Sequence, residues 1–595
     1  MAGPFLVDTP YCKIPNLDPL DISVKHWVRQ PMRVACPRDM SLTYVFGGKL
    51  FVNWTAVNIS YLKEGKMVAY CRYQSIQHPE NGKHNDYSYS VESDKFREWV
   101  NVSKEFIRTQ CYNASNNVIY TNFHYVMNPL YSKSDVEVPR ETRTPNVLLV
   151  GVDSVSRMNY IRYMKKTQQV MLKLGALEFV GYNKVADNTF VNLVPLLAGK
   201  FAEELPWNEK IRHQTFDPFR FLWNGYRDRG FKTLFVEDSP LTAMFDNAKA
   251  GFRKNPTDFY NRPMAVAMEE TSEIWFENHF CVLDRLETDI LLDYVYSVIR
   301  MISKHPYFAL VYLSRMTHDY IEDAGTIDGS IYRFFDDLRA SRLLENTVVV
   351  LFSDHGMRFG EIRNTYIGKL EERLPLLNVI IPTRFAKGRI KELHNLMTNT
   401  NRLTTPFDIY EFLNHLLYFD DYKPSSTYGV SLMNTIPLNR TCPSAMISSH
   451  WCTCTEMIIV QNNSSIVNMI SNLFVRIINA KFINISDQCA TLNLDNIESS
   501  YLIKPLDSLL KFESSENEVL NQKIRYGDPV NPVVDYQVTI RTRPGGGVFE
   551  GTFRHNEEYM ALDLVSDISR LNKYRDGSYC IQNSELKKYC YCANN

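Results

Sequence analysis

The sequence predicts an α/β protein with a mostly parallel central sheet flanked by helices, and three observations support this prediction. Continuous apolar runs at 145–152 and 346–352 have the composition of strands that are buried on both faces. Each run ends abruptly in a carboxylate, Asp153 after the first run and Asp354 after the second. Segments with helical spacing of their apolar residues separate the runs, which is the pattern of right-handed βαβ units.

This alternation extends over residues 144–440, which we expect to form one large domain. Further strands are expected after glycine or proline, where a short apolar run begins. Helices are expected where apolar residues recur at intervals of three and four. The further strands are expected at 231–238, 307–313 and 376–382, and the helices at 160–174, 288–302, 330–344 and 406–417.

Two further regions are expected outside this domain, because 595 residues are too many for one ordinary core. Residues 1–143 mix short alternating runs with turn clusters and predict a β-rich, cysteine-containing N-terminal region. Residues 441–595 predict a cysteine-rich α+β region. Within it, the segment 535–553 resembles an antiparallel hairpin that turns at a proline followed by three glycines.

Composition and charge exclude several classes of protein. Hydrophobic residues make up 45% of the chain and charged residues 22%, as in a globular protein. The net charge of -1 gives no overall field that favours nucleic acid. No segment has the length and apolar character of a membrane span, and neither a signal nor an anchor is visible in this chain.

The twelve cysteines and the glycosylation sequons lie mainly in the two outer regions. This distribution favours a disulfide-bonded glycoprotein of the extracellular space or the secretory lumen. Two C-x-C pairs lack the spacing of common zinc modules, so disulfides are the first interpretation. The sequon asparagines are Asn53, Asn58, Asn101, Asn113, Asn439, Asn462, Asn463 and Asn484.

Polar residues at the ends of the two buried strands form the first candidate site. In open α/β sheets, ligands bind beyond the carboxyl ends of the strands. Asp354 and His355 follow one strand and Asp153 follows the other. Carboxylate and imidazole are side chains that bind zinc, although an Asp-His pair also occurs as a turn cap.

Thr189 stands directly before an apolar helical segment and has two interpretations. A threonine at that position can cap the helix through its hydroxyl oxygen. Alternatively, the positive end of the helix dipole would stabilise an alkoxide there, and a neighbouring metal would lower the pKa of the hydroxyl further. The second interpretation makes Thr189 a nucleophile.

The order Asp153, Thr189, His318, Asp354-His355 within alternating strands and helices resembles the alkaline phosphatase and sulfatase superfamily. The segment 189–192, Thr-Phe-Val-Asn, is similar to the Thr-Phe-Pro-Asn nucleophile motif of nucleotide pyrophosphatase/phosphodiesterases, and 353–357 matches their Ser-Asp-His-Gly-Met. The segments 151–159, 371–375 and 450–454 resemble more closely an animal family, known from nematodes and insects. Its members are sulfatase-like extracellular proteins catalogued as a domain of unknown function.

This resemblance implies a role for each matching residue. Asp153, Thr189, Asp354 and His355 match the ligands of the metal ion that activates the nucleophile. Asn192 matches an amide that holds a substrate oxygen.

The resemblance implies a second metal site less clearly. His318 matches its histidine, but Ser314 stands where the phosphodiesterases have an aspartate. His450 is a positional candidate for their late histidine, with a structural role beside the neighbouring cysteines as the alternative. Arg157 and Lys369 are candidates either for cationic contacts to the transferring group or for ion pairs, and Glu237 and Asp238 are candidates for the pocket lining.

The implied function is metal-dependent hydrolysis or transfer of phosphate esters, with Zn²⁺ as the cofactor at one site and a second ion left open. The expected substrates are small-molecule, lipid-head-group or glycan-linked esters. A catalytically degenerate extracellular binding protein on the same fold is one alternative. A sulfatase-like ester hydrolase is another, but the chain has no Cys/Ser-x-Pro-x-Arg motif at the nucleophile position.

Overall fold

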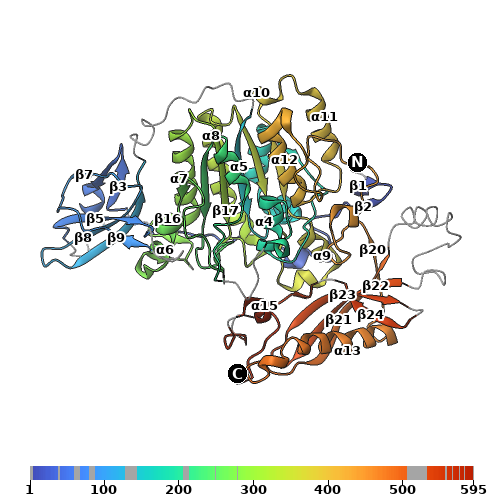
Figure 1. The fold of residues 1–595 in the computed structure, drawn as a ribbon. Coiled ribbons are helices and arrows are strands. Elements are labelled where there is room, and N and C mark those ends of the chain that lie inside the picture. The colour runs from blue at the N-terminus through green and yellow to red at the C-terminus, as the bar shows by residue number, and fades with distance from the viewer. Residues whose placement is uncertain are drawn as a thin grey trace.

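The computed structural model describes residues 4–37, 41–58, 67–79, 87–127, 144–205, 213–247, 249–277, 279–504, 533–556, 559–565, 567–574, 577–581 and 583–593. A seven-stranded sheet lies at the centre (Figure 1). Four consecutive pairs in it are parallel, and one strand beside them runs antiparallel. The mostly parallel sheet is therefore confirmed. Its strands, in spatial order, are β11 (Leu177–Glu178), β19 (Leu377–Ile380), β18 (Thr347–Phe352), β10 (Asn146–Val152), β17 (Tyr307–Leu313), β12 (Lys232–Glu237) and β13 (Phe259–Tyr260).

Helices cover both faces of this sheet, because side chains of its inner strands alternate between two apolar cores. Val147 and Leu149 of β10 belong to one core, and Leu148 and Val150 belong to the other. Burial of each such side chain contributes about 1.5–3 kcal/mol. The first core includes residues of α4 (Thr189–Ala198), α5 (Leu222–Asp228), α11 (Ile390–Asn399) and α12 (Pro406–Tyr418). The second includes residues of α2 (Arg157–Tyr163), α3 (Lys165–Lys173), α6 (Arg262–Glu269), α7 (Glu287–Met301) and α8 (Ala324–Ala340).

The helix predicted at 160–174 is two helices, α2 and α3, which meet at Met164. The backbone of Met164 leaves the helical region with ψ at 50°. The carboxylate of Asp328, on α8, accepts hydrogen bonds from the first amides of α3, at 3.0 Å from Lys166 N and 2.8 Å from Thr167 N. A side chain from a distant helix thus caps α3, and local periodicity contains no sign of this contact.

The N-terminal region is rich in strands, as predicted, but it divides in space. One hairpin, β1 (Phe5–Thr9) and β2 (Cys12–Pro15), lies apart from the other strands of this region (Figure 1). We call residues 41–127 the N-terminal unit, and the expected boundary near 143 lies outside the described residues. The unit has one sheet of β3 (Thr43–Phe46), β4 (Lys49–Val52) and β7 (Trp99–Asn101), and another of β6 (Ser88–Tyr89), β5 (Tyr70–Gln77), β8 (Phe106–Tyr112) and β9 (Val118–Tyr125).

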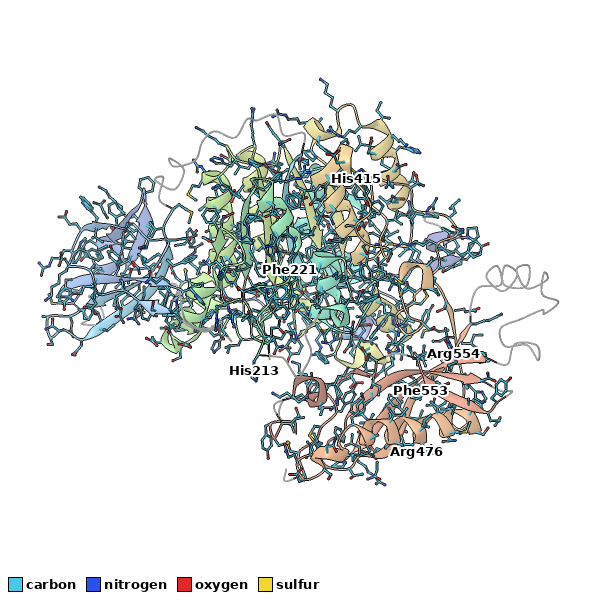
Figure 2. All side chains as sticks on the ribbon, in the orientation of Figure 1. His213, Phe221, His415, Arg476, Phe553 and Arg554 are labelled. Atoms are coloured by element: carbon cyan, nitrogen blue, oxygen red, sulfur yellow. A yellow bond between two sulfur atoms is a disulfide. The ribbon has the colours of Figure 1, made fainter. Side chains whose placement is uncertain are left out.

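We call residues 456–593 the C-terminal unit, and its antiparallel sheet packs against one long helix (Figure 1). Phe553, labelled in Figure 2, contacts Phe474 of α13 (Ser465–Ala480) with ring centroids 5.0 Å apart. The predicted hairpin is confirmed, and its turn places Gly545 and Gly546 at positive φ. The strands are β20 (Glu456–Ile459), β21 (Asn493–Lys504), β22 (Val533–Arg543), β23 (Val548–Asn556), β24 (Ala561–Leu564) and β25 (Ser569–Arg570).

Short elements and disulfides complete the molecule. The short elements are α1 (Trp54–Ala56), β14 (Trp275–Phe276), β15 (Cys281–Val282), β16 (Arg285–Leu286), α9 (Tyr366–Arg373), α10 (Thr383–Ala386) and α15 (Ser584–Lys587). All twelve cysteines are paired, as Cys12–Cys454, Cys36–Cys281, Cys71–Cys111, Cys442–Cys452, Cys489–Cys590 and Cys580–Cys592. Within the described ranges, no helix combines the length and apolar character required to cross a membrane.

Candidate active site

The ends of two neighbouring strands bring three predicted ligands together. β10 and β18 pair in parallel, so the residues that follow them reach the same edge of the sheet. One ligand atom each of Asp153, Asp354 and His355 lies within 4.8 Å of the others. These residues are only 2%, 1% and 1% exposed. Burial of two carboxylates with one imidazole requires compensation, because like charges and desolvation both oppose it.

The hydrogen bonds of His355 determine its tautomer. Its Nδ1 lies 2.8 Å from the carbonyl oxygen of Gly356, which can only accept, so Nδ1 carries the proton. Burial lowers the pKa of His355 to about 3, and the ring is therefore neutral at physiological pH. The lone pair of Nε2 consequently points toward Asp354 Oδ2 at 3.1 Å and Asp153 Oδ1 at 3.8 Å.

This arrangement fits a bound cation. Asp354 Oδ2 is buried and has no hydrogen-bond partner, so a lone pair of the imidazole faces a lone pair of the carboxylate. Two acceptors at that distance repel each other unless a proton or a metal ion lies between them. Burial, together with the charge of Asp354, raises the pKa of Asp153 to about 7, which shows the same excess of negative charge. Two carboxylates and one imidazole nitrogen are a donor set suited to Zn²⁺.

Thr189 is the first residue of α4, and the helix cap is Asn188. The capping role considered for Thr189 is therefore wrong. Its Oγ1 instead lies 3.4 Å from His355 Nε2, beside the three candidate ligands. The hydroxyl stands at the positive end of the α4 dipole, where developing negative charge is stabilised. The structure thus places all four residues predicted for the first metal site in one cluster.

Asn192 holds the loop that leads into α4. Its Oδ1 accepts from the amides of Val185 and Ala186, at 2.9 and 3.0 Å. Its Nδ2 donates to the carbonyls of Ala186 and Asn188, at 2.9 and 3.0 Å. Both amide protons are used within the protein, so the structure gives Asn192 a positioning role and no free donor for the predicted contact with a substrate oxygen.

His318 lies beside this cluster but outside the group of converging ligand atoms. Its Nδ1 is 2.9 Å from Asp319 Oδ1. Burial alone would lower its pKa, but the carboxylates of Asp319 and Asp153 outweigh burial and raise it. Ser314, the predicted departure from the phosphodiesterase pattern, donates through N and Oγ to Asp238 Oδ1 at 2.8 and 2.9 Å. Asp238 thus lies next to the position of the missing aspartate, with its carboxylate engaged in hydrogen bonds.

His450 contacts the C-terminal unit instead of the cluster. Its Nδ1 is 2.7 Å from Thr552 Oγ1 and its Nε2 is 3.2 Å from Ser569 Oγ. The ring is fully buried, and burial lowers its pKa to about 3. With both nitrogens engaged by hydroxyl groups, His450 joins two parts of the protein and offers no free ligand atom, in contrast to the predicted metal role.

Two residues near the cluster escaped prediction. Arg358 pairs with Asp187 at 3.1 Å, and its charge affects the pKa of Asp153, His318 and His355. Tyr312 is buried beside Asp354 and Thr189, and burial with the charges of Asp153 and Asp354 raises its pKa. Arg358 follows the Ser-Asp-His-Gly-Met run directly, so its position in the sequence could have indicated that it lies near the candidate ligands. The Tyr312 position carried none, because an apolar run gives no reason to single out one aromatic residue.

The other charged residues predicted near the site, two cations and one carboxylate, have partners outside the cluster. Arg157 pairs with Glu178 at 2.8 Å. Lys369 is fully buried and pairs with Glu550 of the C-terminal unit. Glu237 accepts from Met244 N at 2.9 Å. None of these contacts reaches the three converging ligand atoms.

The fold and the site together define an α/β protein with a buried carboxylate-imidazole centre next to a threonine at a helix terminus. The chain belongs to the family described as "Protein of unknown function (DUF229)", whose model matches residues 32–498. The predicted family is therefore confirmed, as is the predicted fold class with its β-rich N-terminal and α+β C-terminal additions.

Known proteins with partial similarity were also found. An uncharacterized protein of Haemophilus influenzae is 22% identical over 263 residues, which are 42% of this chain and 38% of that protein. The chain thus spans about two fifths of this curated relative. Three solved structures also have similarity to the chain. One is a Vibrio parahaemolyticus protein in the alkaline phosphatase superfamily, with a TM-score of 0.36 and 9% identity over 77% of this chain and 92% of that one. Another is the lipoteichoic acid synthase LtaP from Listeria monocytogenes, with a TM-score of 0.34 and 10% identity over 56% of this chain and 83% of that one. The third is the C-terminal periplasmic domain of EptC from Escherichia coli, with a TM-score of 0.34 and 14% identity over 49% of this chain and 87% of that one.

Proposed function

We propose that this protein is a metal-dependent hydrolase or transferase of phosphate esters with Thr189 as its nucleophile. The observation that carries the proposal is the pair of facing acceptors, His355 Nε2 and Asp354 Oδ2, which are 3.1 Å apart. Thr189 Oγ1 lies 3.4 Å from the same nitrogen. A cation held by Asp153, Asp354 and His355 would therefore adjoin the threonine hydroxyl.

The chemistry assigned to the residues follows from this placement. Zn²⁺ bound to the three ligands would supply Lewis acidity and lower the pKa of an adjacent hydroxyl. Thr189 Oγ1 would form a bond to phosphorus while the bond from phosphorus to the leaving oxygen breaks, and the leaving group departs as an alcohol or alkoxide. Water or an acceptor alcohol would then displace Thr189 from the phosphothreonine and restore its hydroxyl.

The surrounding residues support this reaction in three ways. The dipole of α4 favours negative charge on Thr189 Oγ1. Asn192 fixes the loop before α4 through four hydrogen bonds and so positions the threonine. Arg358 supplies a positive charge near the cluster, where an anionic ester would approach.

Binding without catalysis is the second candidate function, and Ser314 favours it. Ser314 contributes no carboxylate to a second ion, and the neighbouring Asp238 is already engaged in hydrogen bonds. A protein with only the first metal site could bind an anionic ester without turning it over. If the protein is an enzyme with one metal ion, it needs Thr189 as the nucleophile. If it only binds the ester, it does not, so the two candidates differ in the role of Thr189.

Substitution of Thr189 tests the proposal directly. Turnover of bis(p-nitrophenyl) phosphate, p-nitrophenyl phosphate and p-nitrophenyl sulfate would be measured side by side, with metal content determined by mass spectrometry. We expect zinc in the purified protein, preference for a phosphate ester, and a loss of about a thousandfold or more in Thr189→Ala with zinc retained. Thr189→Ser should keep part of the activity.

The matched control is Thr400→Ala, since the Thr400 hydroxyl donates to Met397 O and accepts from Asn401 Nδ2, both local groups at the end of α11. It should keep full activity. Full turnover by Thr189→Ala would rule out the threonine mechanism. Zinc-loaded protein without turnover of any ester would favour the binding protein, and preference for the sulfate ester would favour a sulfatase-like reaction.

We also propose that the protein works outside the cytosol, on small-molecule, lipid-head-group or glycan-linked esters. Six disulfides support an oxidising compartment. Several sequon asparagines are exposed, as glycosylation requires, namely Asn58, Asn101, Asn439, Asn463 and Asn484. Mass spectrometry of protein secreted from animal cells, before and after glycosidase treatment, tests whether the disulfides form and whether these asparagines are glycosylated.

A further inference from the structure

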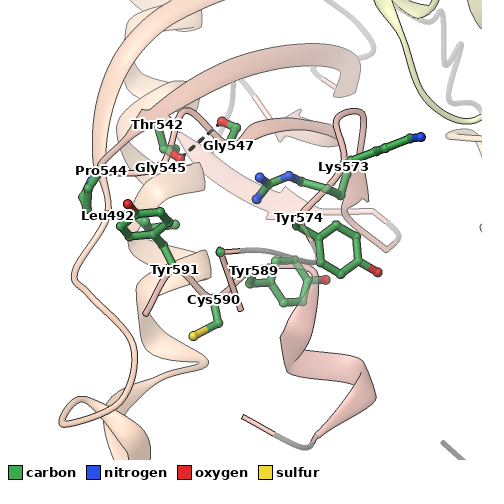
Figure 3. Close-up of a pocket in the computed structure, with 12 residues that line it drawn as sticks. Leu492, Thr542, Pro544, Gly545, Gly547, Lys573, Tyr574, Tyr589, Cys590 and Tyr591 are labelled. Carbon is green, nitrogen blue, oxygen red and sulfur yellow. Dashed lines mark hydrogen bonds between the residues drawn. The ribbon is translucent and has the colours of Figure 1, made fainter. Parts of the chain in front are cut away.

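A pocket of about 350 Å³ lies in the C-terminal unit, away from the converging ligand atoms (Figure 3). Three tyrosines and two cations contribute to its wall, together with glycines of the β22–β23 turn. We call it the tyrosine-arginine pocket, defined by Arg570, Lys573, Tyr574, Tyr589 and Tyr591. Its volume lies in the range of small-molecule sites.

The turn glycines make room for the pocket walls. A side chain at Gly545 would collide with the Tyr591 ring, and that glycine has a φ of +82°, which other residues rarely adopt. A Cβ at Gly547 would lie 2.7 Å from Arg570 Nη1. The run of three glycines, which the first metal site does not explain, therefore allows Tyr591 and Arg570 to approach the backbone.

Arg570 is a buried cation in the wall of this pocket. It is 7% exposed, and no carboxylate of the described residues forms an ion pair with it. Its Nε donates to Asn572 Oδ1 at 2.6 Å and its Nη1 donates to Lys588 O at 3.2 Å. Burial lowers its pKa to about 10. The guanidinium lies over the rings of Phe549 and Tyr574, 4.7 and 5.7 Å from their centroids. A guanidinium with aromatic and neutral partners in a pocket wall is a site for an anion, because the planar fork binds carboxylate, phosphate and sulfate oxygens.

The tyrosines give the pocket aromatic surface beside this charge. Figure 3 shows Tyr574, Tyr589 and Tyr591 around the cavity, with Tyr591 near the glycine turn. The disulfides of Cys590 and Cys592 hold the segment that carries Tyr589 and Tyr591. Rigid rings beside a cation suit a ligand that joins an anionic group to a ring with apolar faces, such as a sugar.

Two lysines connect this part of the C-terminal unit with the candidate active site. Lys573 Nζ lies 3.1 Å from Asp319 Oδ2, and Asp319 is the hydrogen-bond partner of His318. Lys588 Nζ lies 3.7 Å from Asp187 Oδ2, two residues before Thr189. Lys573 belongs to the pocket wall and Lys588 precedes Tyr589. These two ion pairs hold the segments around the pocket against the loops that carry His318 and Asp187.

We propose that the tyrosine-arginine pocket binds an anionic sugar unit of the substrate, with its phosphate, sulfate or carboxylate group on Arg570 and its ring against the tyrosines. This inference rests on the proposed function, because it assigns the pocket to the substrate of the Thr189 site. The pocket acts in recognition only, since no residue of it lies among the converging ligand atoms.

Titration calorimetry on the full chain tests the pocket. The four probes are glucose 6-phosphate, glucose 6-sulfate, glucuronate and glucose. Binding of at least one anionic sugar and no detectable binding of glucose are expected, and the tightest probe identifies the anionic group. Arg570→Gln should weaken that probe tenfold or more. Arg476→Gln is the matched control, because Arg476 is exposed on α13 (Figure 2) and does not line the pocket; it should change affinity less than twofold.

Tyr574→Ser separates the ring contact from the charge. It should weaken the sugar several-fold while leaving the affinity for the corresponding inorganic anion within twofold. Circular dichroism melts of each variant identify misfolded protein. Equal affinity of folded Arg570→Gln and wild type, or no binding of any anionic sugar to wild type, would overturn the proposal.

Turnover of bis(p-nitrophenyl) phosphate distinguishes failure of this inference from failure of the proposed function. That small ester carries no sugar, so its turnover by the wild-type protein reports on the Thr189 site without the pocket. Sugar binding without aryl ester turnover would refute the catalytic proposal alone. Aryl ester turnover without sugar binding would refute the pocket alone.

Discussion

The two flanking β units attach to the central domain in different ways. The C-terminal unit buries many charged side chains against it, whereas the N-terminal unit makes apolar contacts and isolated hydrogen bonds. Figure 1 shows the two units at different sides of the central sheet. The difference indicates which unit takes part in the site.

Buried charges dominate the contact of the C-terminal unit. Glu550 of β23 is fully buried among three cations, which outweigh the effect of burial and hold its pKa well below its usual range. Burial lowers the pKa of Lys369 to about 8. Cations outnumber anions in this network, whose members are Lys184, Arg363, Lys369, Arg373, Glu372 and Glu550.

The N-terminal unit meets the central domain near α7, and none of its described residues belongs to that charge network. Tyr294 of α7 donates to Glu105 at 2.6 Å, and Ser41 donates to Asp284 at 2.6 Å. Phe106 and Phe123 join the apolar core of that face. No residue of this unit ion-pairs with the loops that carry Thr189 or His318 in the described structure. The comparison therefore predicts that the C-terminal unit affects both stability and activity, and that the N-terminal unit affects stability alone.

The largest effect is expected from Glu550→Gln. Removal of this carboxylate leaves three buried cations with less compensation, so the free energy of unfolding should fall by about 3–5 kcal/mol. Urea denaturation measures the change. Glu498→Gln on the neighbouring β21 is the control, because its pair with Arg541 is partly exposed and should contribute at most about 1 kcal/mol. Equal losses in both variants would contradict the importance of the buried network.

Removal of one disulfide from each unit extends the comparison between the two units. Replacement of Cys489 and Cys590 by serine, or of Cys71 and Cys111 by serine, should each cost about 2–4 kcal/mol. Only the first pair adjoins the tyrosine-arginine pocket, so only that variant should lose affinity for an anionic sugar, measured by calorimetry. A similar loss of affinity in the second variant would show that the N-terminal unit also reaches the site.

The smallest effect is expected from Glu105→Gln in the N-terminal unit. Burial raises the pKa of Glu105 to about 7 from an ordinary value of 4.5. The folded state therefore holds a proton that the unfolded chain has lost, and stability falls as pH rises from 4.5 through 7. The glutamine variant should be more stable than wild type at pH 8 and equal to it below pH 4.5, with the difference growing as pH rises between these values.

Thermal melts across this pH range measure the effect of Glu105→Gln. At every pH, the variant and wild type should have the same activity on the aryl ester, since Glu105 lies in the N-terminal unit. A constant difference in stability between the two proteins at all pH values would show that Glu105 titrates normally.

The parts of the fold that the sequence predicted are those with local signals. Buried strands such as β10 and β18 appear as unbroken apolar runs, and strand topology brings their terminal residues, Asp153 and Asp354, together. The break at Met164 and the partners of His450 escaped prediction, because they depend on Asp328 and Thr552, which are distant in sequence. The position of Asn192 in the helix was predicted, but its four hydrogen bonds depend on a loop conformation that no spacing reveals.

The disulfide between Cys12 and Cys454 spans 442 residues of sequence and ties the first hairpin to the segment that precedes the C-terminal unit. During synthesis, Cys12 leaves the ribosome long before Cys454, and six other cysteines, at 36, 71, 111, 281, 442 and 452, emerge in between. Pairing in order of appearance would join Cys12 to the wrong partner. Correct oxidation of this chain therefore requires either protection of Cys12 until Cys454 has been made or later exchange of a mispaired bond.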